Sequence, residues 1–248
     1  MSVRIGAISV GGMGVRFRRP GTQKCLTLLS GRPILEYSID SFVANKVKLI
    51  FLLTGHLHEQ ISSYLVKRSL QGKDSDVVVS AVYGGLEGEI GALRKLRPFI
   101  DEDFLYTEGD TVFTNRTVQS LISKADRHKD GVAVLSVSKS VEIALKHPRI
   151  SVDSLTSRIA SIAVTDQEME NNRSAKYARM GLYYFRKKVF PLLENIPFGR
   201  PPSEIIRYAL MNDLPFFASI TTNPWFCLHD QEDFKKWNRS DVKQYFMD

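Results

Sequence analysis

The chain has 248 residues, of which 43% are hydrophobic and 25% charged, and its 34 Lys and Arg outnumber 27 Asp and Glu to give a net charge of +7. This composition excludes collagen-like, low-complexity and wholly disordered chains, and the length suits one large core as well as two small ones. The positive charge permits an anionic partner, which could be a nucleotide, a sugar phosphate, a polynucleotide or a membrane surface.

Short β-rich apolar runs alternate with stretches of helical period in the first half, the pattern of βαβ units. This half predicts strands over 4–10, 46–54, 76–83, 104–108 and 131–137, and helices over 33–43, 58–69, 89–96 and 117–128. The second half predicts strands over 158–164, 179–185 and 216–221, and helices over 189–195, 202–211 and 232–238. Because the alternation is lost there, we expect a mixed sheet edge.

The organisation predicts one domain over 1–248, since neither a repeat nor a flexible linker divides the chain. Its fold class is α/β, with a central mixed, mostly parallel sheet. The first apolar run ends in glycines and fails as a signal peptide, and no run approaches the roughly 20 residues that span a bilayer. Two cysteines are too few for a disulfide framework or a structural zinc site. We therefore expect a cytoplasmic protein that does not use a membrane.

The first predicted strand runs into Gly11-Gly12-Met13-Gly14, a turn where the backbone can approach a ligand closely and point N–H groups at phosphate oxygens. Arg16 and Lys24 then supply cations, whereas Arg18 and Arg19 are expected to be solvated surface charges. The dinucleotide fingerprint fails because Phe17 stands where Gly or Ala is needed. A P-loop fails because the Gly-Lys pair at 72–73 is followed by Asp.

With the sequence that follows it, this turn resembles the signature of the sugar-1-phosphate nucleotidyltransferases. The resemblance continues through Leu26-x-x-x-x-Gly31-x-Pro33-Ile34-Leu35-Glu36-Tyr37, the Gly-Glu-Ile-Gly-Ala-Leu run at 88–93 and the Glu-Gly-Asp run at 108–110, and more loosely through 181–185 and 225–234. It implies a three-layer Rossmann-like nucleotidyltransferase fold. The N-terminal half would bind the nucleotide and the C-terminal half the acceptor.

Roles for the matching residues follow from the resemblance. It implies that Gly11, Gly12 and Gly14 wrap the nucleotide and that Gly88 lies against the base. It also implies that Arg16 contacts the departing pyrophosphate and Lys24 the reacting phosphates. The chemistry is consistent, because nucleotidyl transfer needs positioning and positive charge and no nucleophilic side chain.

Asp110 ends a predicted strand, where open α/β sheets gather ligands, and suits Mg2+ held mainly by phosphates and water. Cys227 stands where the family's second metal-binding Asp is expected, and a neutral thiol is a poor ligand for Mg2+. Either Asp230 reaches the metal, or Asp110 and phosphates hold it alone, or activity is lost.

The sequence departs from the family pattern at two further places, the acceptor-phosphate lysine and the first turn. The Glu-Lys-Pro that often carries the sugar-phosphate lysine is missing, and Lys176 or Arg179 either replaces it or is a surface charge. Gln23 replaces the usual Pro before Lys24, and the loop between Arg16 and Lys24 is short. A loop of this length is closer to cytidylyltransferases that act on polyol or sugar-acid phosphates.

The sequence therefore predicts transfer of an NMP from an NTP to a sugar 1-phosphate or similar phosphate monoester, with Mg2+ and release of pyrophosphate. Three alternatives stay open: a non-catalytic nucleotide or nucleotide-sugar binding homologue, a cytidylyltransferase acting on a polyol phosphate, and a glycosyltransferase. The last is weakened because Glu108-Gly109-Asp110 is not Asp-x-Asp. No basic stripe spaced for a polynucleotide is present, so no nucleic-acid partner is expected, while the base, the acceptor and a homo-oligomer are left open.

Overall fold

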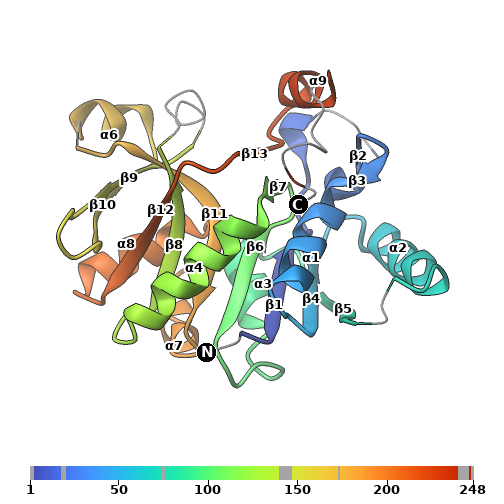
Figure 1. Cartoon of the computed structure of the whole chain (residues 1–248), viewed down its shortest axis with the longest axis horizontal. Helices are drawn as coiled ribbons and strands as arrows, with labels where there is room; N and C mark the ends of the chain where they lie inside the picture. Colours follow the sequence, from blue (N-terminus) through green and yellow to red (C-terminus); the bar gives the residue numbers. More distant parts are fainter. Residues whose placement is uncertain are drawn as a thin grey trace.

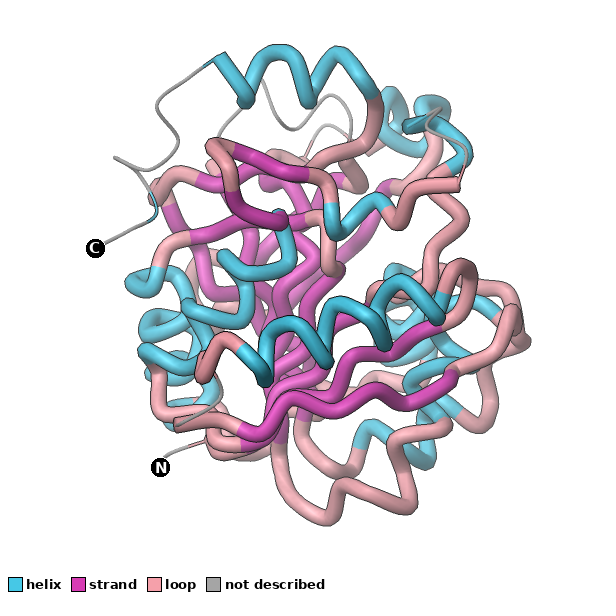
Figure 2. Tube along the Cα trace, turned by 90° about the vertical axis from the view of Figure 1, so that its right-hand side faces the viewer, coloured by secondary structure: helices cyan, strands magenta, loops and turns pink. Residues whose placement is uncertain are grey.

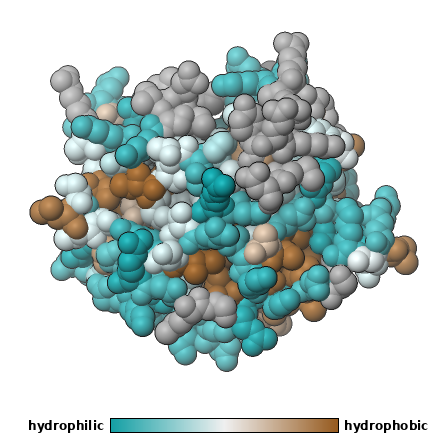
Figure 3. Space-filling view, in the orientation of Figure 1, coloured by the Kyte–Doolittle hydropathy of each residue, from teal (hydrophilic) through white to brown (hydrophobic). Residues whose placement is uncertain are grey.

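The computed structural model of the chain describes residues 3–17, 21–73, 76–139, 147–172, 174–239 and 246. The prediction of solvated charges at Arg18 and Arg19 lies outside these residues. Across the described ranges, no helix has the length and apolarity needed to cross a membrane. The face drawn in Figure 3 is largely hydrophilic, with apolar side chains in separate groups.

A nine-stranded mixed sheet crosses the molecule (Figure 1). Its main path runs through β10 (Ile159–Ala163), β9 (Arg149–Val152), β11 (Tyr177–Phe185), β6 (Phe104–Glu108), β1 (Ile5–Ser9), β4 (Leu49–Thr54) and β5 (Val78–Tyr83). The strand β8 (Ala133–Ser138) pairs with β11, and β12 (Phe216–Thr221) pairs with β8. Neighbours from β6 to β5 are parallel, as are β8 and β12, whereas β11 is antiparallel to β6, β8 and β9. The predicted fold class, including its mixed edge, is confirmed.

Helices cover both faces of the sheet, giving three layers (Figures 1 and 2). One face packs against α1 (Ile34–Ala44), α2 (His58–Leu70) and α4 (Asn115–Arg127). The other packs against α3 (Gly88–Arg94), α7 (Val189–Leu193) and α8 (Ser203–Met211). Among the described residues, the remaining helices are α6 (Asp166–Asn171), α9 (Gln231–Arg239) and the single 3-10 turns η1 (Val15–Phe17) and η2 (Lys24–Leu26).

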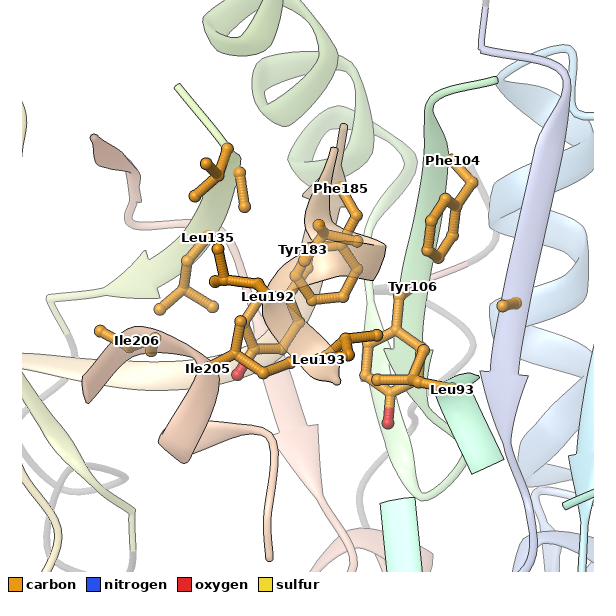
Figure 4. Close-up of a cluster of buried hydrophobic side chains, with 14 of the residues drawn as sticks. Leu93, Phe104, Tyr106, Leu135, Tyr183, Phe185, Leu192, Leu193, Ile205 and Ile206 are labelled. Atoms are coloured by element: carbon orange, nitrogen blue, oxygen red, sulfur yellow. The ribbon is translucent and has the colours of Figure 1, made fainter. Parts of the chain in front are cut away.

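The two faces are built by alternation of side chains along each central strand. In β1, Ala7 belongs to the core under α3 and α7, and its neighbour Ile8 belongs to the core under α1 and α4. In β6, Tyr106 belongs to the first of these cores and its neighbour Leu105 to the second. Because both faces are covered, these strands read as continuous apolar runs. Figure 4 shows part of the first core, with the Tyr106 and Tyr183 rings among leucines and isoleucines.

Several short strands are absent from the sequence-based prediction: β2 (Leu28–Leu29), β3 (Arg32–Pro33), β7 (Thr111–Phe113), β9 and β13 (Trp225–Cys227). The antiparallel pair of β7 and β13 matters most, since it sets Cys227 opposite Thr111. Strands of three residues have no measurable period, so the pattern of the sequence cannot reveal them. Through this pair, the C-terminal segment returns to the end of β6.

Candidate active site

The glycine turn lies where the carboxyl ends of three parallel strands meet. Ser9, the last residue of β1, pairs in register with Leu53 of β4 and with Glu108 of β6. Two hydrogen bonds hold the ends together: Gly109 N–H donates to the Ser9 carbonyl at 2.8 Å, and Val10 N–H donates to the Leu53 carbonyl at 2.9 Å. Ligands of open α/β sheets bind at this edge.

Two adjoining cavities open at this edge, one polar and one mainly apolar. The polar cavity has a volume of about 290 Å3, and its wall includes Gly12, Gly14, Arg16, Lys24, Asp110 and His229. The apolar cavity has a volume of about 390 Å3, and its wall includes Gly11, Gly12, Met13, Leu53, Leu86 and Gly88. The structure thus gathers the predicted glycines, both predicted cations and Asp110 at one place.

An ion pair between Lys24 and Asp110 lies in the polar cavity, with Nζ 2.5 Å from Oδ2. Burial works against the charge of each group, but the opposite charge and the hydrogen bond of the pair, with smaller contributions from neighbours, act the other way, so the pKa of Lys24 is raised and the pKa of Asp110 is lowered. Arg16 lines the same cavity from η1, and within the described part of the chain no carboxylate pairs with it. Lys24 therefore stays charged within its ion pair, and Arg16 presents a second cation to the same cavity.

Gln23 explains how Lys24 is held. Its side chain is buried, and Nε2 donates to the carbonyls of Val10 at 2.7 Å and His56 at 2.9 Å. Its backbone N–H donates to Oε1 of Gln60 at 2.8 Å. A proline at this position would lack that N–H and both side-chain donors. The replacement noted in the sequence is thus an anchor that ties the residue before Lys24 to the end of β1.

Cys227 lies beside Asp110, as the resemblance implied for the position of the second aspartate. Its Sγ donates to Oδ1 of Asp110 at 3.4 Å. Burial and then the Asp110 carboxylate raise the pKa of Cys227, so the thiol stays neutral. No group of three His, Cys, Asp or Glu side chains among the described residues could hold a metal ion. These donors fit Mg2+ only where Asp110 shares it with phosphates and water.

Asp230 has a structural position at the start of α9. Its Oδ1 accepts from Asp233 N–H at 2.9 Å, which makes it the N-cap of that helix. The side chain that this segment contributes to the cavity wall is His229. Its Oδ1 is engaged in the cap and Asp230 is not among the residues that line the polar cavity, so its role as a metal ligand stays a prediction.

A histidine pair that the sequence did not reveal lies beside the polar cavity, whose wall includes one of the two, His229. Nε2 of His229 lies 3.0 Å from Nε2 of His147, and Nδ1 of His229 lies 3.9 Å from Sγ of Cys227. Burial, followed by the second imidazole, lowers the pKa of His147 to about 3. Both rings are therefore neutral at pH 7. They lie 82 positions apart in the chain, so spacing could not have paired them.

Arg179 and Glu108 form a second ion pair in the wall of the polar cavity. Nη1 of Arg179 also donates to the Tyr183 hydroxyl at 3.0 Å, whereas its buried Nε has no partner among the described residues. Of the two basic residues proposed for the acceptor phosphate, Arg179 lies at the cavity and Lys176 is exposed on the surface. The sequence named Arg179 but could not show that Glu108 neutralises it.

Gly88 is required by its surroundings as well as by any ligand. It has a φ of +77°, and a Cβ added there would lie 2.9 Å from Cα of Gly199. The segment at Gly199 is held against this turn by a hydrogen bond from its N–H to the Glu87 carbonyl at 2.7 Å. A side chain at 88 would therefore strain the backbone and separate the two segments, in addition to entering the apolar cavity.

Comparison with known proteins identifies the family. Residues 6–211 match the sequence model of the MobA-like NTP transferase domain. The chain belongs to this family. This NTP transferase is 26% identical over 186 residues to the bifunctional protein GlmU of Methanocaldococcus jannaschii, a match that covers 74% of the chain and 40% of the relative. It is 30% identical over 112 residues to the CMP-5'-(3-aminopropyl)phosphonate synthase of Streptomyces rubellomurinus, covering 44% of the chain and 18% of that relative.

The chain thus spans two fifths or less of the length of these curated relatives. Solved structures match it over nearly its whole length. The inositol-1-phosphate CTP transferase from T. maritima superposes with a TM-score of 0.79 at 18% identity, over 100% of this chain and 96% of that one. A UDP-glucose pyrophosphorylase bound to UDP-glucose gives a TM-score of 0.81 at 13% identity, over 98% and 99%. At these identities, the likeness establishes the nucleotidyltransferase fold.

Proposed function

We propose that this NTP transferase moves a nucleoside monophosphate from an NTP to a sugar 1-phosphate or a similar phosphate monoester, with release of pyrophosphate. The observation that carries the proposal is the apolar cavity joined, across the glycine turn, to a polar cavity that holds Arg16 and the Lys24–Asp110 pair. We treat residues 1–248 as one catalytic domain, whose N-terminal half binds the nucleotide.

The two cavities divide an NTP by its chemistry. The apolar one suits the base, because the side chains of Met13 and Leu86 at its wall expose apolar surface that a ring would cover. The polar one suits the triphosphate, since Lys24 and Arg16 neutralise charge that gathers on the leaving pyrophosphate. Gly14, with a φ of +59°, lets the backbone turn between the two.

The acceptor itself supplies the nucleophile. One of its phosphate oxygens forms a bond to the α-phosphorus, the bond from the α-phosphorus to the α–β bridging oxygen breaks, and pyrophosphate leaves with that electron pair. The protein positions both reactants and supplies positive charge. Asp110 would hold Mg2+ together with phosphates, and the ion would add charge neutralisation. Glu108, Arg179 and His229 form the part of the wall left for the acceptor.

The names of the relatives support a small molecule that carries a phosphate or phosphonate group as the acceptor. They do not agree on the rest of that molecule. They include UDP-glucose pyrophosphorylases, an inositol-1-phosphate CTP transferase and a CMP-phosphonate synthase. A second candidate is therefore a cytidylyltransferase for a polyol phosphate or a phosphonate, favoured by the short loop between Arg16 and Lys24. A binding protein without turnover is the third, because Cys227 leaves one acidic ligand in place of two.

A pyrophosphate-release screen tests the proposal. Purified protein is incubated with Mg2+, each common NTP and a panel of sugar 1-phosphates, polyol phosphates and phosphonates. We expect release with at least one pair, and a loss of about 100-fold or more in Arg16→Ala and Asp110→Ala, because Arg16 would neutralise charge on the leaving pyrophosphate and Asp110 would hold the Mg2+ that does the same. The exposed Arg116→Ala on α4 serves as the matched control. The proposal would be refuted if no substrate pair in the panel released pyrophosphate, or if both site variants kept full activity.

A further inference from the structure

The two cavities share three wall residues, Ser9, Gly12 and Glu89. This boundary matters because the sugar of an NTP joins its base to its triphosphate. If the base lies in the apolar cavity and the phosphates lie beside Lys24, the sugar crosses the shared wall. The inference below rests on this placement and therefore on the proposed function.

Of the three shared residues, Glu89 has the side chain that can contact a sugar. Gly12 has none, and the Ser9 hydroxyl is engaged with Glu89 and Tyr106. The Tyr106 hydroxyl donates to Oε1 of Glu89 at 3.3 Å. Tyr106 is wholly buried in the core of β6, with its ring among the side chains in Figure 4. The buried Tyr106 thus fixes the position of the Glu89 side chain, and Glu89 lines both cavities.

The charge state of Glu89 suits a neutral polar partner. Burial, followed by the nearby Glu108 carboxylate, raises the pKa of Glu89 to about 8. Tyr106 donates to this group, so at neutral pH its own O–H is left as a donor and its oxygens keep acceptor capacity. A hydroxyl both donates and accepts, and matches such a group. The phosphates already have Lys24 and Arg16, and the base has an apolar wall.

We infer that Glu89 hydrogen-bonds the sugar hydroxyls of the bound NTP and makes the protein select ribonucleoside over 2'-deoxyribonucleoside triphosphates. Removal of the 2'-hydroxyl leaves a part-buried polar group without its partner. A hydrogen bond of this kind corresponds to a factor of about 10 in affinity.

Calorimetric titration of the intact chain tests the inference. The probes are the pairs ATP and dATP, CTP and dCTP, GTP and dGTP, and UTP and dUTP, each with Mg2+. For the base bound most tightly, we expect the ribonucleotide to bind about tenfold tighter than its deoxy partner. Glu89→Gln, which keeps a neutral donor and acceptor, should retain most of that ratio. Glu89→Ala should bring the ratio close to one by weakening the ribonucleotide.

The matched control is Glu87→Gln, an exposed carboxylate on the same turn, which should keep the wild-type ratio. Thermal unfolding of each variant shows whether Glu89→Ala is folded, and if it is not, Glu89→Leu, which fills the same space without a hydrogen-bonding group, is measured in its place. Equal affinity of the wild type for both sugars overturns the inference, as does an unchanged ratio in folded Glu89→Ala or the binding of no NTP.

Pyrophosphate release separates this test from that of the proposed function. Release without a sugar preference supports the transferase and overturns the role of Glu89. A tenfold preference that is lost in Glu89→Ala, without release from any acceptor, supports the role of Glu89 and refutes turnover.

Discussion

At the scale of single residues, the candidate site depends on groups whose charges balance in pairs. Lys24 pairs with Asp110 and Arg179 with Glu108, while Glu89 and the two histidines stay neutral. Arg16 is left as the cation without a counter-ion among the described residues. These groups therefore sum to one positive charge, that of Arg16, which attracts anions together with the dipoles of the glycine turn.

Cys227 can be converted into the acidic residue that the family resemblance expects. In Cys227→Asp, a second carboxylate would replace a thiol that lies 3.4 Å from Oδ1 of Asp110. Two carboxylates suit Mg2+ better than one, so the Mg2+ concentration for half-maximal pyrophosphate release should fall about tenfold. Without metal the two like charges should lower the free energy of unfolding, and Mg2+ should restore it.

The control for this variant is Cys227→Ser, which is neutral and of similar size. It should keep the Mg2+ dependence of the wild type. If Cys227→Asp shows the same dependence as Cys227→Ser, the thiol does not occupy a metal-ligand position.

Glu89 gives a pH dependence of stability with a definite sign. Its pKa is raised to about 8 by burial and then by Glu108, whereas in an unfolded chain a glutamate has a pKa of about 4.3. Between those pH values the unfolded state releases a proton that the folded state keeps, so the free energy of unfolding falls as pH rises. Glu89→Gln removes this penalty while keeping a neutral side chain.

Urea denaturation at pH 5 and pH 8 measures the effect. We expect Glu89→Gln to gain about 1–3 kcal/mol on the wild type at pH 8 relative to their difference at pH 5. If the difference in the free energy of unfolding between Glu89→Gln and the wild type is the same at both pH values, Glu89 is ionised in the folded protein.

At the scale of elements, the long periodic segments are predictable and the short ones are not. The strand β1 is a continuous apolar run and the helix α4 buries one face at helical period, so the sequence predicts both to within a few residues. The strands β7 and β13 have three residues each, yet their pairing brings Cys227 to Asp110. The predicted residues came together because the motif lies at strand ends, whereas the His147–His229 contact depends on tertiary packing.

Gln23 links three elements and gives a prediction about stability. Its amide satisfies the carbonyls of Val10 and His56 in a buried place. Gln23→Ala leaves two buried acceptors unpaired and should lower the free energy of unfolding by about 1–3 kcal/mol. Because Lys24 follows directly, the KM for NTP should also rise. Urea denaturation and initial rates measure the two effects.

An exposed glutamine on α4 provides the comparison. Gln119→Ala should change the free energy of unfolding by less than about 0.5 kcal/mol and leave KM unchanged. A loss in Gln23→Ala no larger than in Gln119→Ala would mean that the buried amide does not anchor the turn.

At the scale of the whole molecule, the sheet explains why one edge carries the chemistry. The parallel strands from β6 to β5 deliver the glycine turn and Asp110, while β11, antiparallel to β6, brings Arg179 against Glu108. In the proposed function, the part of the +7 net charge that contacts the substrate is Arg16 and Lys24 at this edge. The base and the acceptor skeleton were not predictable, because both are read by side chains and loops that meet only after folding.

The central claim is that one NTP and one phosphorylated acceptor yield one nucleotidyl product and one pyrophosphate. The most direct measurement is 31P NMR of the reaction with the best substrate pair from the screen. We predict that signals of a product with a P–O–P linkage between the nucleotide and the acceptor phosphate grow in a ratio of one to one with those of pyrophosphate, and that neither grows with Lys24→Ala. Release of a nucleoside diphosphate, or of pyrophosphate without the linked product, would contradict the account.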